Sequence, residues 1–291
     1  DHRDLHSFPT RRSSDLYIME AKKVLFINQE IIPYVPESEM SHLGRLIPQV
    51  IQDKGYEIRT FMPKWGNINE RRGQLHEVIR LSRMMLIIDE TDHPLIIKVA
   101  SIPSTRIQVY FIDNEDYFTK RLMAFDENGK EYDDNGERAV FFARGVLETV
   151  KKLRWTPDII HCQGWMCSII PLYIKTAYQD EPSFANTKVV TSLFSEELHD
   201  NLGANFRQSI AFRNVTPEIL DSYGDNFGFL ELEKLAIDYS DGIVNAGKSV
   251  NPDIIKYAEG KGLPMITNPA DDEICQVYDE FYDRVMLGKS E

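Results

Sequence analysis

Apolar and polar positions along this chain follow two periods, one typical of strands and one typical of helices. A short apolar run at residues 23–28 predicts a buried parallel strand, and residues 41–54 then carry apolar side chains on one helical face. Gly55 ends this helix, and residues 57–62 predict a second strand that completes a βαβ unit. Pro48 lies inside the predicted helix, so we expect a kink or the start of a new segment there.

A different pattern follows from residue 75 to residue 113. Three β-rich runs are separated by turn residues with no helix between them, at residues 78–88, 95–100 and 107–112. This arrangement predicts antiparallel hairpins at one edge of the sheet. Residues 120–136 are polar and rich in Gly and Asp, which predicts an exposed loop.

The remainder of the chain alternates between predicted strands and predicted helices. Strands are predicted at residues 159–160, 189–192 and 242–244, and helices at 138–153, 165–178, 230–239, 252–259 and 272–285, with loop and short helix over 195–223. Repeated βα alternation predicts an α/β fold, with a Rossmann-like, doubly wound, mostly parallel sheet covered on both faces and a β-hairpin edge.

Composition and charge narrow the classes of partner. The 291 residues are 42% hydrophobic and 27% charged, which is ordinary for a folded domain. The chain has 33 Lys and Arg residues and 46 Asp and Glu residues, so its net charge is −13. This charge excludes free nucleic acid and anionic membranes as expected partners, because both would be repelled. A neutral polysaccharide is permitted.

The cysteines and the N-terminal residues bear on compartment and on domain limits. Cys162, Cys167 and Cys275 form no disulfide framework, which favours a reducing, cytoplasmic compartment, and the spacing gives no metal site. No run approaches the roughly 18 apolar residues of a membrane span.

Residues 1–18 look like a translated sequencing adapter, with Met19 as the start. We expect a non-native or disordered tail over residues 1–18 and one α/β domain over residues 19–291.

Ligands of open α/β sheets bind beyond the carboxyl ends of the strands, so the strand-to-helix junctions carry the functional information. These junctions lie at residues 28–34, 62–66, 157–165 and 188–194. Together they resemble the N-terminal domain of bacterial glycogen and starch synthases, which have the GT-B glycosyltransferase fold, over roughly residues 22–263. The resemblance implies one half of a two-domain, starch synthase-like catalytic unit, whose other half holds most of the donor nucleotide.

Several positions depart from the motifs of that family. Its E-x-x-P-[FY] motif is matched by Glu30, Pro33 and Tyr34, but its K-T-G-G-L loop is replaced by Pro36-Glu37-Ser38-Glu39-Met40. The H-x-H-D-W motif retains His161 and Trp165, with Gln163 and Gly164 in place of the second His and the Asp. Leu193 stands where the family's T-[IV]-H-N has its histidine, and residues 245–248 replace T-V-S-P. These changes remove phosphate-binding and hydrogen-bonding groups, so we expect no catalysis by this chain alone.

Five residues are the candidates for substrate binding, and none is a candidate for catalysis: His161, Gln163, Trp165, Tyr34 and Lys64. Gln163 can hydrogen-bond a sugar hydroxyl, and Trp165 can stack on a sugar ring. The alternatives are a neutral core histidine at position 161, a core or rim tryptophan at position 165 and a solvated loop lysine at position 64. We expect no cofactor and no metal.

Three functional hypotheses follow. The first is a glycogen or starch synthase-family protein of α-glucan metabolism whose donor-binding half is supplied separately, which predicts an exposed apolar docking face. The second is a non-catalytic module that binds or senses an α-glucan. The third is a homodimer with a scaffolding role that associates through the open cleft face.

Overall fold

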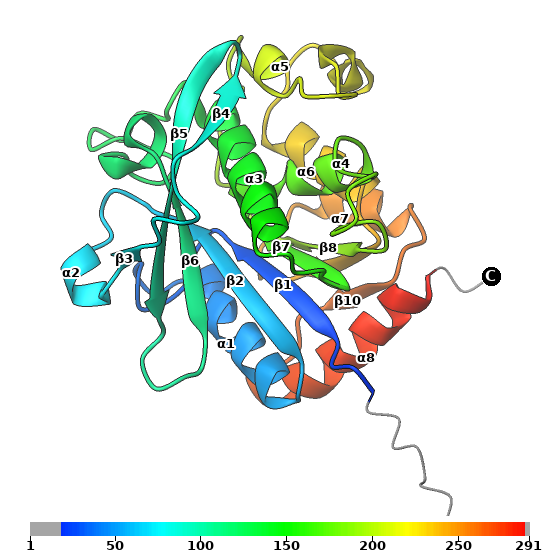
Figure 1. Ribbon diagram of the computed structural model, residues 1–291. Coiled ribbons are helices and arrows are strands. Elements are labelled where there is room, and N and C mark those ends of the chain that lie inside the picture. Colours follow the sequence, from blue (N-terminus) through cyan, green and yellow to red (C-terminus); the bar gives the residue numbers. More distant parts are fainter. Residues whose placement is uncertain (1–18, 289–291) are drawn as a thin grey trace, which may run out of the picture.

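A ten-stranded sheet organises the computed structural model, which describes residues 19–288 (Figure 1). The strand order is β10-β9-β8-β7-β1-β2-β6-β5-β3, and β4 pairs with β5 outside this path. All neighbours from β10 to β6 are parallel, whereas β5 is antiparallel to β6, β3 and β4. The predicted mostly parallel α/β sheet with a hairpin edge is therefore confirmed. The prediction for residues 1–18 lies outside the described residues.

The elements have the following bounds in chain order: β1 (Lys23–Asn28), α1 (Glu39–Asp53), β2 (Glu57–Pro63), α2 (Glu70–Gly73), β3 (His76–Glu77), β4 (Met84–Ile88), β5 (Thr91–Ser101), β6 (Gln108–Asp113), η1 (Glu115–Thr119), α3 (Asn135–Lys152), β7 (Ile159–Gln163), η2 (Trp165–Cys167), α4 (Ile170–Lys175), β8 (Lys188–Leu193), α5 (Phe206–Ser209), η3 (Pro217–Tyr223), α6 (Phe229–Asp238), β9 (Gly242–Asn245), α7 (Pro252–Glu259), β10 (Met265–Thr267), η4 (Asp271–Glu273) and α8 (Ile274–Leu287).

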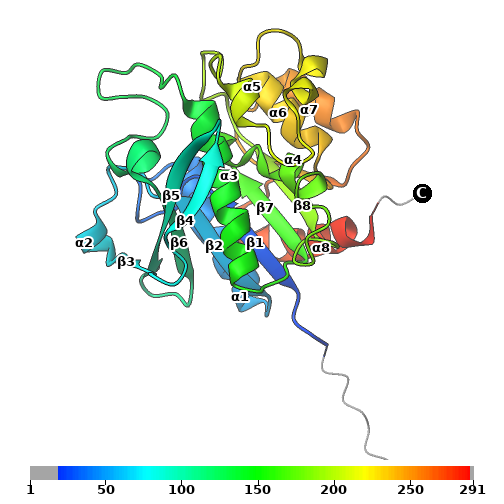
Figure 2. The same ribbon diagram turned by 45° about the horizontal axis from the view of Figure 1, so that its top comes forward.

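Helices cover both faces of the sheet, and alternate residues of the strands point to opposite faces. In β1, Leu25 and Ile27 belong to the larger apolar cluster, which α3, α4 and α6 complete. Val24 and Phe26 belong to a second cluster on the opposite face, where α1 and α8 pack (Figures 1 and 2). The continuous apolar runs of the parallel strands are explained by this burial on both sides.

Helix α1 tolerates Pro48 because a side chain replaces the missing main-chain donor. Pro48 has no N–H to give to the carbonyl of Gly44, four residues earlier. The side-chain amide of Asn28 donates to that carbonyl instead, at 3.0 Å. The helix therefore runs without a break through Pro48, where the sequence predicted a kink or a new segment. A Cβ at position 44 would lie 2.1 Å from the carbonyl oxygen of Glu30, so the close approach of α1 to the preceding loop requires glycine.

Further local predictions differ from the structure. The helix predicted over residues 165–178 is a 3-10 turn followed by the short helix α4, because Pro171 favours a helix start and not an interior position. Strand β10 was missed, since it has three residues and prolines on either side. The loop over residues 120–136 is exposed at residues 127–130, but Ala124 and Glu131 within it are buried.

Candidate functional site

Strands β1 and β7 are parallel neighbours at the centre of the sheet, and the chain leaves them towards opposite faces of the sheet. The connection after β1 passes through α1 on one face, and the connection after β7 passes through α4 on the other. Such a switch point leaves a crevice beyond the carboxyl ends of the two strands. The main-chain N–H of Gln29 donates to the carbonyl of Gln163 across this position, at 3.0 Å.

Gln29 connects the switch point to two later segments. Its Nε2 donates to a carboxylate oxygen of Glu197 at 2.8 Å, and its Oε1 accepts from the main-chain N–H of Met166 at 3.1 Å. Gly164 has φ 98°, and a Cβ there would lie 2.6 Å from the side chain of Gln29. The glycine that replaces the aspartate of the synthase motif therefore leaves the space that Gln29 occupies.

Two glutamates near this position retain protons close to neutral pH. Burial raises the pKa of Glu197 to about 7, with a further contribution from the charge of Glu30. Burial and the charge of Glu197 raise the pKa of Glu233 to about 8, and Oε2 of Glu233 has no hydrogen-bond partner among the described residues. Sequence reasoning missed both, although Glu233 falls on the apolar stripe of α6 with Leu232 and Ala236.

His161 is fully buried, with both ring nitrogens engaged. Nδ1 lies 2.7 Å from the hydroxyl of Tyr282, and Nε2 lies 2.7 Å from the hydroxyl of Ser192. Burial lowers the pKa of His161 to about 3, so the ring is neutral. This placement favours the core-histidine alternative, and a role in substrate binding stays a prediction.

The other four predicted residues also lie below the surface. Gln163 has neither side-chain polar atom bonded within residues 19–288, and the indole N–H of Trp165 likewise has no partner there. The Tyr34 hydroxyl is unpartnered in the same part of the chain, and burial raises its pKa to about 12. Lys64 is buried against Glu70, with Nζ 3.0 Å from Oε1. Their predicted contact with substrate stays a prediction.

A cleft of about 830 Å³ opens at the carboxyl ends of β9 and β10, beside the N-terminus of α1. It is lined by residues 37–39, 42–43, 245–248 and 267–271. The lining includes three carboxylates, those of Glu37, Glu39 and Asp271, one lysine, Lys248, and one histidine, His42. Nε2 of His42 lies 2.8 Å from Oδ2 of Asp271. The cleft is therefore anionic and rich in hydrogen-bond acceptors, and none of the five predicted site residues lines it.

The segment that replaces the family's lysine-glycine loop forms the start of α1. The hydroxyl of Ser38 accepts from the N–H of Ser41 at 3.0 Å, and the hydroxyl of Ser41 accepts from the N–H of Ser38 at 2.8 Å. This reciprocal capping box satisfies donors that a phosphate would otherwise use. The carboxylate of Glu39 accepts from the main-chain N–H of Lys248 at 3.2 Å and so joins the two sides of the cleft.

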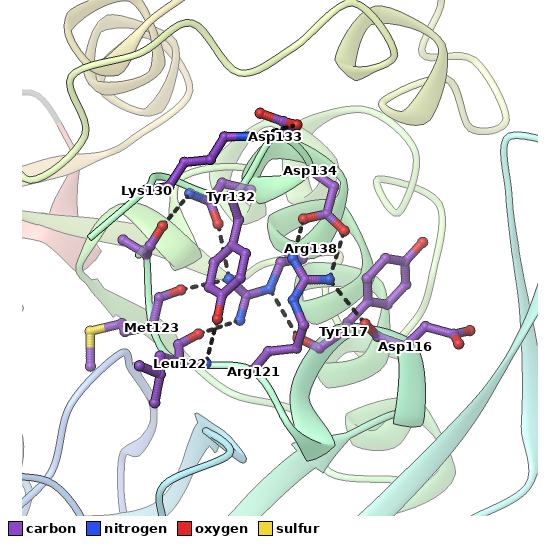
Figure 3. Close-up of polar contacts among 12 residues, drawn as sticks. Asp116, Tyr117, Arg121, Leu122, Met123, Lys130, Tyr132, Asp133, Asp134 and Arg138 are labelled. Atoms are coloured by element: carbon purple, nitrogen blue, oxygen red, sulfur yellow. Dashed lines mark hydrogen bonds and ion pairs between the residues drawn. The ribbon is translucent and has the colours of Figure 1, made fainter. Parts of the chain in front are cut away.

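A buried arginine fixes the loop that follows η1. Arg138 donates to the main-chain carbonyls of Tyr117, Leu122 and Met123 at 2.9, 2.8 and 2.6 Å (Figure 3). Burial and the charge of Arg121 lower the pKa of Arg138 to about 9. Arg121 pairs with the carboxylate of Asp134 at the other end of the loop (Figure 3).

Within residues 19–288, no group of three or more His, Cys, Asp or Glu side chains could hold a metal ion, and every helix is too short or too polar to span a membrane.

Comparison with known proteins identifies the family. The family model of the starch synthase catalytic domain matches residues 23–268. The glycogen synthase of Chlorobium limicola is 36% identical over 217 residues, which cover 72% of this chain and 42% of that enzyme. The glycogen synthase of Chlorobaculum parvum is 32% identical over 228 residues, covering 78% of this chain and 46% of that enzyme. The chain thus spans less than half the length of these curated relatives.

A solved structure has the same fold. The catalytic domain of starch synthase IV from Arabidopsis thaliana, bound to ADP and acarbose, superposes with a TM-score of 0.62 at 16% identity, covering 77% of this chain and 45% of that one. Its GT-B fold agrees with the sheet order and the layers described above. From the match over residues 23–268, the chain belongs to the starch synthase catalytic domain family.

Proposed function

We propose that this protein acts in α-glucan metabolism by binding a neutral α-glucan in the cleft between α1 and the ends of β9 and β10, and that it does not transfer glucose from a nucleotide sugar by itself. The observation that carries the proposal is the set of three carboxylates, Glu37, Glu39 and Asp271, in a cleft formed in part by the segment that replaces the family's phosphate-binding loop.

The charge of the cleft opposes a diphosphate. Two unit charges 4 Å apart in water repel by about 1 kcal/mol, and by more where protein excludes water. The positive end of the α1 dipole favours anions, but Glu39 already supplies a negative charge in the first turn, and the capping box uses local main-chain donors. Lys248 is the one lysine or arginine among the residues that line the cleft.

A neutral sugar chain fits the same groups. Carboxylate oxygens accept hydrogen bonds from sugar hydroxyls, and side-chain amides both donate and accept. Asn245 lines the cleft, and its Oδ1 is buried without a partner among the described residues. The volume of about 830 Å³ lies within the usual range for small-ligand sites, roughly 300–1,000 Å³.

The surface gives less support to a separately supplied donor-binding half. The large hydrophobic side chains that are exposed in residues 19–288 are Met19, Ile79, Met85, Ile87 and Leu287. None of them lines the cleft. A partner that docks there would contact none of these five side chains.

Calorimetric titration with maltoheptaose and with ADP-glucose in parallel tests the proposal. We expect heat of binding with maltoheptaose and none with ADP-glucose. Asn245→Ala should weaken maltoheptaose binding by about tenfold, the loss of one or two hydrogen bonds. Asn214→Ala, at an exposed turn, is the matched control and should bind as the wild type does. Binding of ADP-glucose by the unmodified protein, or equal affinity of the two variants, would refute this assignment of the cleft.

A further inference from the structure

The β4–β5 hairpin forms a second surface, separate from the cleft. Residues 84–88 and 91–95 pair antiparallel, with Ile88 opposite Thr91 next to a two-residue turn. The turn residues Asp89 and Glu90 have φ of 47° and 63°, as the tight turn of a twisted hairpin requires. The hairpin lies at the rim of the molecule, and its tip points away from the sheet (Figure 1).

Strand β4 is apolar on both of its faces. Leu86 and Ile88 point inward and are buried in the larger core cluster. Met85 and Ile87 point outward, and each is 58% exposed. Ile79, shortly before the strand, is 67% exposed. These are three of the five exposed large hydrophobic residues within residues 19–288, and all three lie in one segment of nine residues, as is expected of an interaction surface.

The outer face of β4 is more accessible to a partner than its free edge. In the antiparallel ladder, the main-chain groups of residues that are not bonded to β5 point outward along the edge. The side chain of Arg144 already donates to the carbonyl of Ile87, and its guanidinium packs 3.9 Å from the ring centre of Phe212. The chain's own residues therefore occupy part of this edge, and the face that carries Met85 and Ile87 is left.

The charges around this face are arranged at opposite ends. Arg80 and Arg83 lie before β4, whereas Asp89, Glu90 and Asp92 lie at the tip of the hairpin. All five side chains are exposed, and none has an ion-pair partner within residues 19–288. A strand that is basic at one end, apolar in the middle and acidic at the other end is complementary to an antiparallel copy of itself.

We propose that the outer face of the β4–β5 hairpin is a contact between two copies of this chain. In a two-fold contact each patch meets the same patch of the partner, so the basic end of one hairpin lies against the acidic tip of the other. Met85 and Ile87 of both copies then pack at the centre, where two sheet faces stack about 10 Å apart. This contact is independent of the proposed glucan cleft and differs from association through the cleft face.

The size of the patch sets the strength of the contact. Stable dimers bury about 1,200–2,000 Å² in total, and three exposed apolar side chains per copy supply only the centre of such an interface. Each copy also carries a net charge of −13, which opposes association. The dimer is therefore expected to form at micromolar concentration and to dissociate on dilution.

Sedimentation velocity from about 1 μM to about 200 μM tests the proposal on the full chain. The wild type should move from monomer towards dimer as the concentration rises. Ile87→Glu should raise the dissociation constant at least about tenfold, because it buries a charge at the centre of the contact. Leu287→Glu is the matched control, since Leu287 is 87% exposed on α8, and it should associate as the wild type does.

Charge reversal separates the local contact from repulsion between the whole molecules. The double variants R80E/R83E and E90K/D92K should each associate at least about tenfold more weakly, and an equimolar mixture of the two should recover association. The second variant lowers the net negative charge, so repulsion between whole molecules alone would strengthen its association. A wild type that stays monomeric throughout, equal effects of Ile87→Glu and Leu287→Glu, or a mixture no tighter than its components would overturn the proposal.

Discussion

Burial changes the acid-base chemistry of single residues near the centre of the sheet. Glu233 has its pKa raised from the ordinary 4.5 to about 8 by burial and by the charge of Glu197. Between these two values the folded chain keeps a proton that the unfolded chain has lost. The free energy of unfolding therefore has its full contribution from Glu233 below about pH 4.5 and loses it as the pH rises towards 8.

Glu233→Gln should make the protein more stable than the wild type at pH 8, because the amide has no charge to desolvate. The expected gain is at least about 1.4 kcal/mol, which corresponds to one pKa unit, and it should nearly vanish at pH 4. Urea denaturation at both pH values measures it. Glu259→Gln, which removes one glutamate at an exposed position on α7, is the matched control. An equal effect of Glu233→Gln at both pH values would show that Glu233 is ionised in the folded protein.

At the scale of elements, the loop of residues 120–134 owes its conformation to a side chain on α3. Arg138→Met removes the hydrogen-bond donors to the main-chain carbonyls of Leu122 and Met123 in this loop and of Tyr117 in the preceding η1. Hydrogen bonds to a charged group contribute about 1.5–3 kcal/mol each. We expect a loss of about 3 kcal/mol or more in unfolding free energy and faster amide hydrogen exchange at residues 120–134. Lys130→Met, at the exposed tip of the same loop, should change neither. If amide hydrogen exchange at residues 120–134 were unchanged in Arg138→Met, the arginine would not be the residue that fixes this loop.

The hydrophobic pattern predicted well the elements whose apolar residues are all buried in the core. It failed where a single contact between residues distant in sequence determines the local structure. The strands at the centre of the sheet and α7 have bounds close to those predicted, because apolar runs and helical stripes follow directly from burial. The continuity of α1 depends on the amide of Asn28, which is distant in sequence from Pro48. The site was less predictable for the same reason. Motif positions identified the junctions after β1 and β7 and two segments that line the cleft, residues 37–39 and 245–248, whereas part of the remaining lining comes from β10, a strand that the pattern did not predict.

At the scale of the whole molecule, net charge distinguishes the two classes of ligand. A neutral glucan does not interact with the field of a protein of charge −13, whereas a nucleotide sugar is repelled by it at long range and by the carboxylates of the cleft at short range. Salt screens the long-range part, since the Debye length falls from about 30 Å at 0.01 M to about 3 Å at 1 M. The dependence of binding on salt therefore reports which ligand the cleft accepts.

Maltoheptaose affinity should stay constant within about twofold from low salt to about 0.5 M NaCl. ADP-glucose should bind detectably only to the double variant Glu37→Gln/Glu39→Gln, because each removed charge relieves about 1 kcal/mol, or about fivefold in affinity. That binding should strengthen as salt screens the remaining negative charge. Glu127→Gln/Glu137→Gln makes the same change in net charge at residues that do not line the cleft, and it should not bind the nucleotide sugar. If both double variants bound ADP-glucose equally well, the net charge and not the α1 segment would exclude the nucleotide. If only Glu37→Gln/Glu39→Gln bound it, the exclusion would be assigned to the segment that replaces the family's phosphate loop.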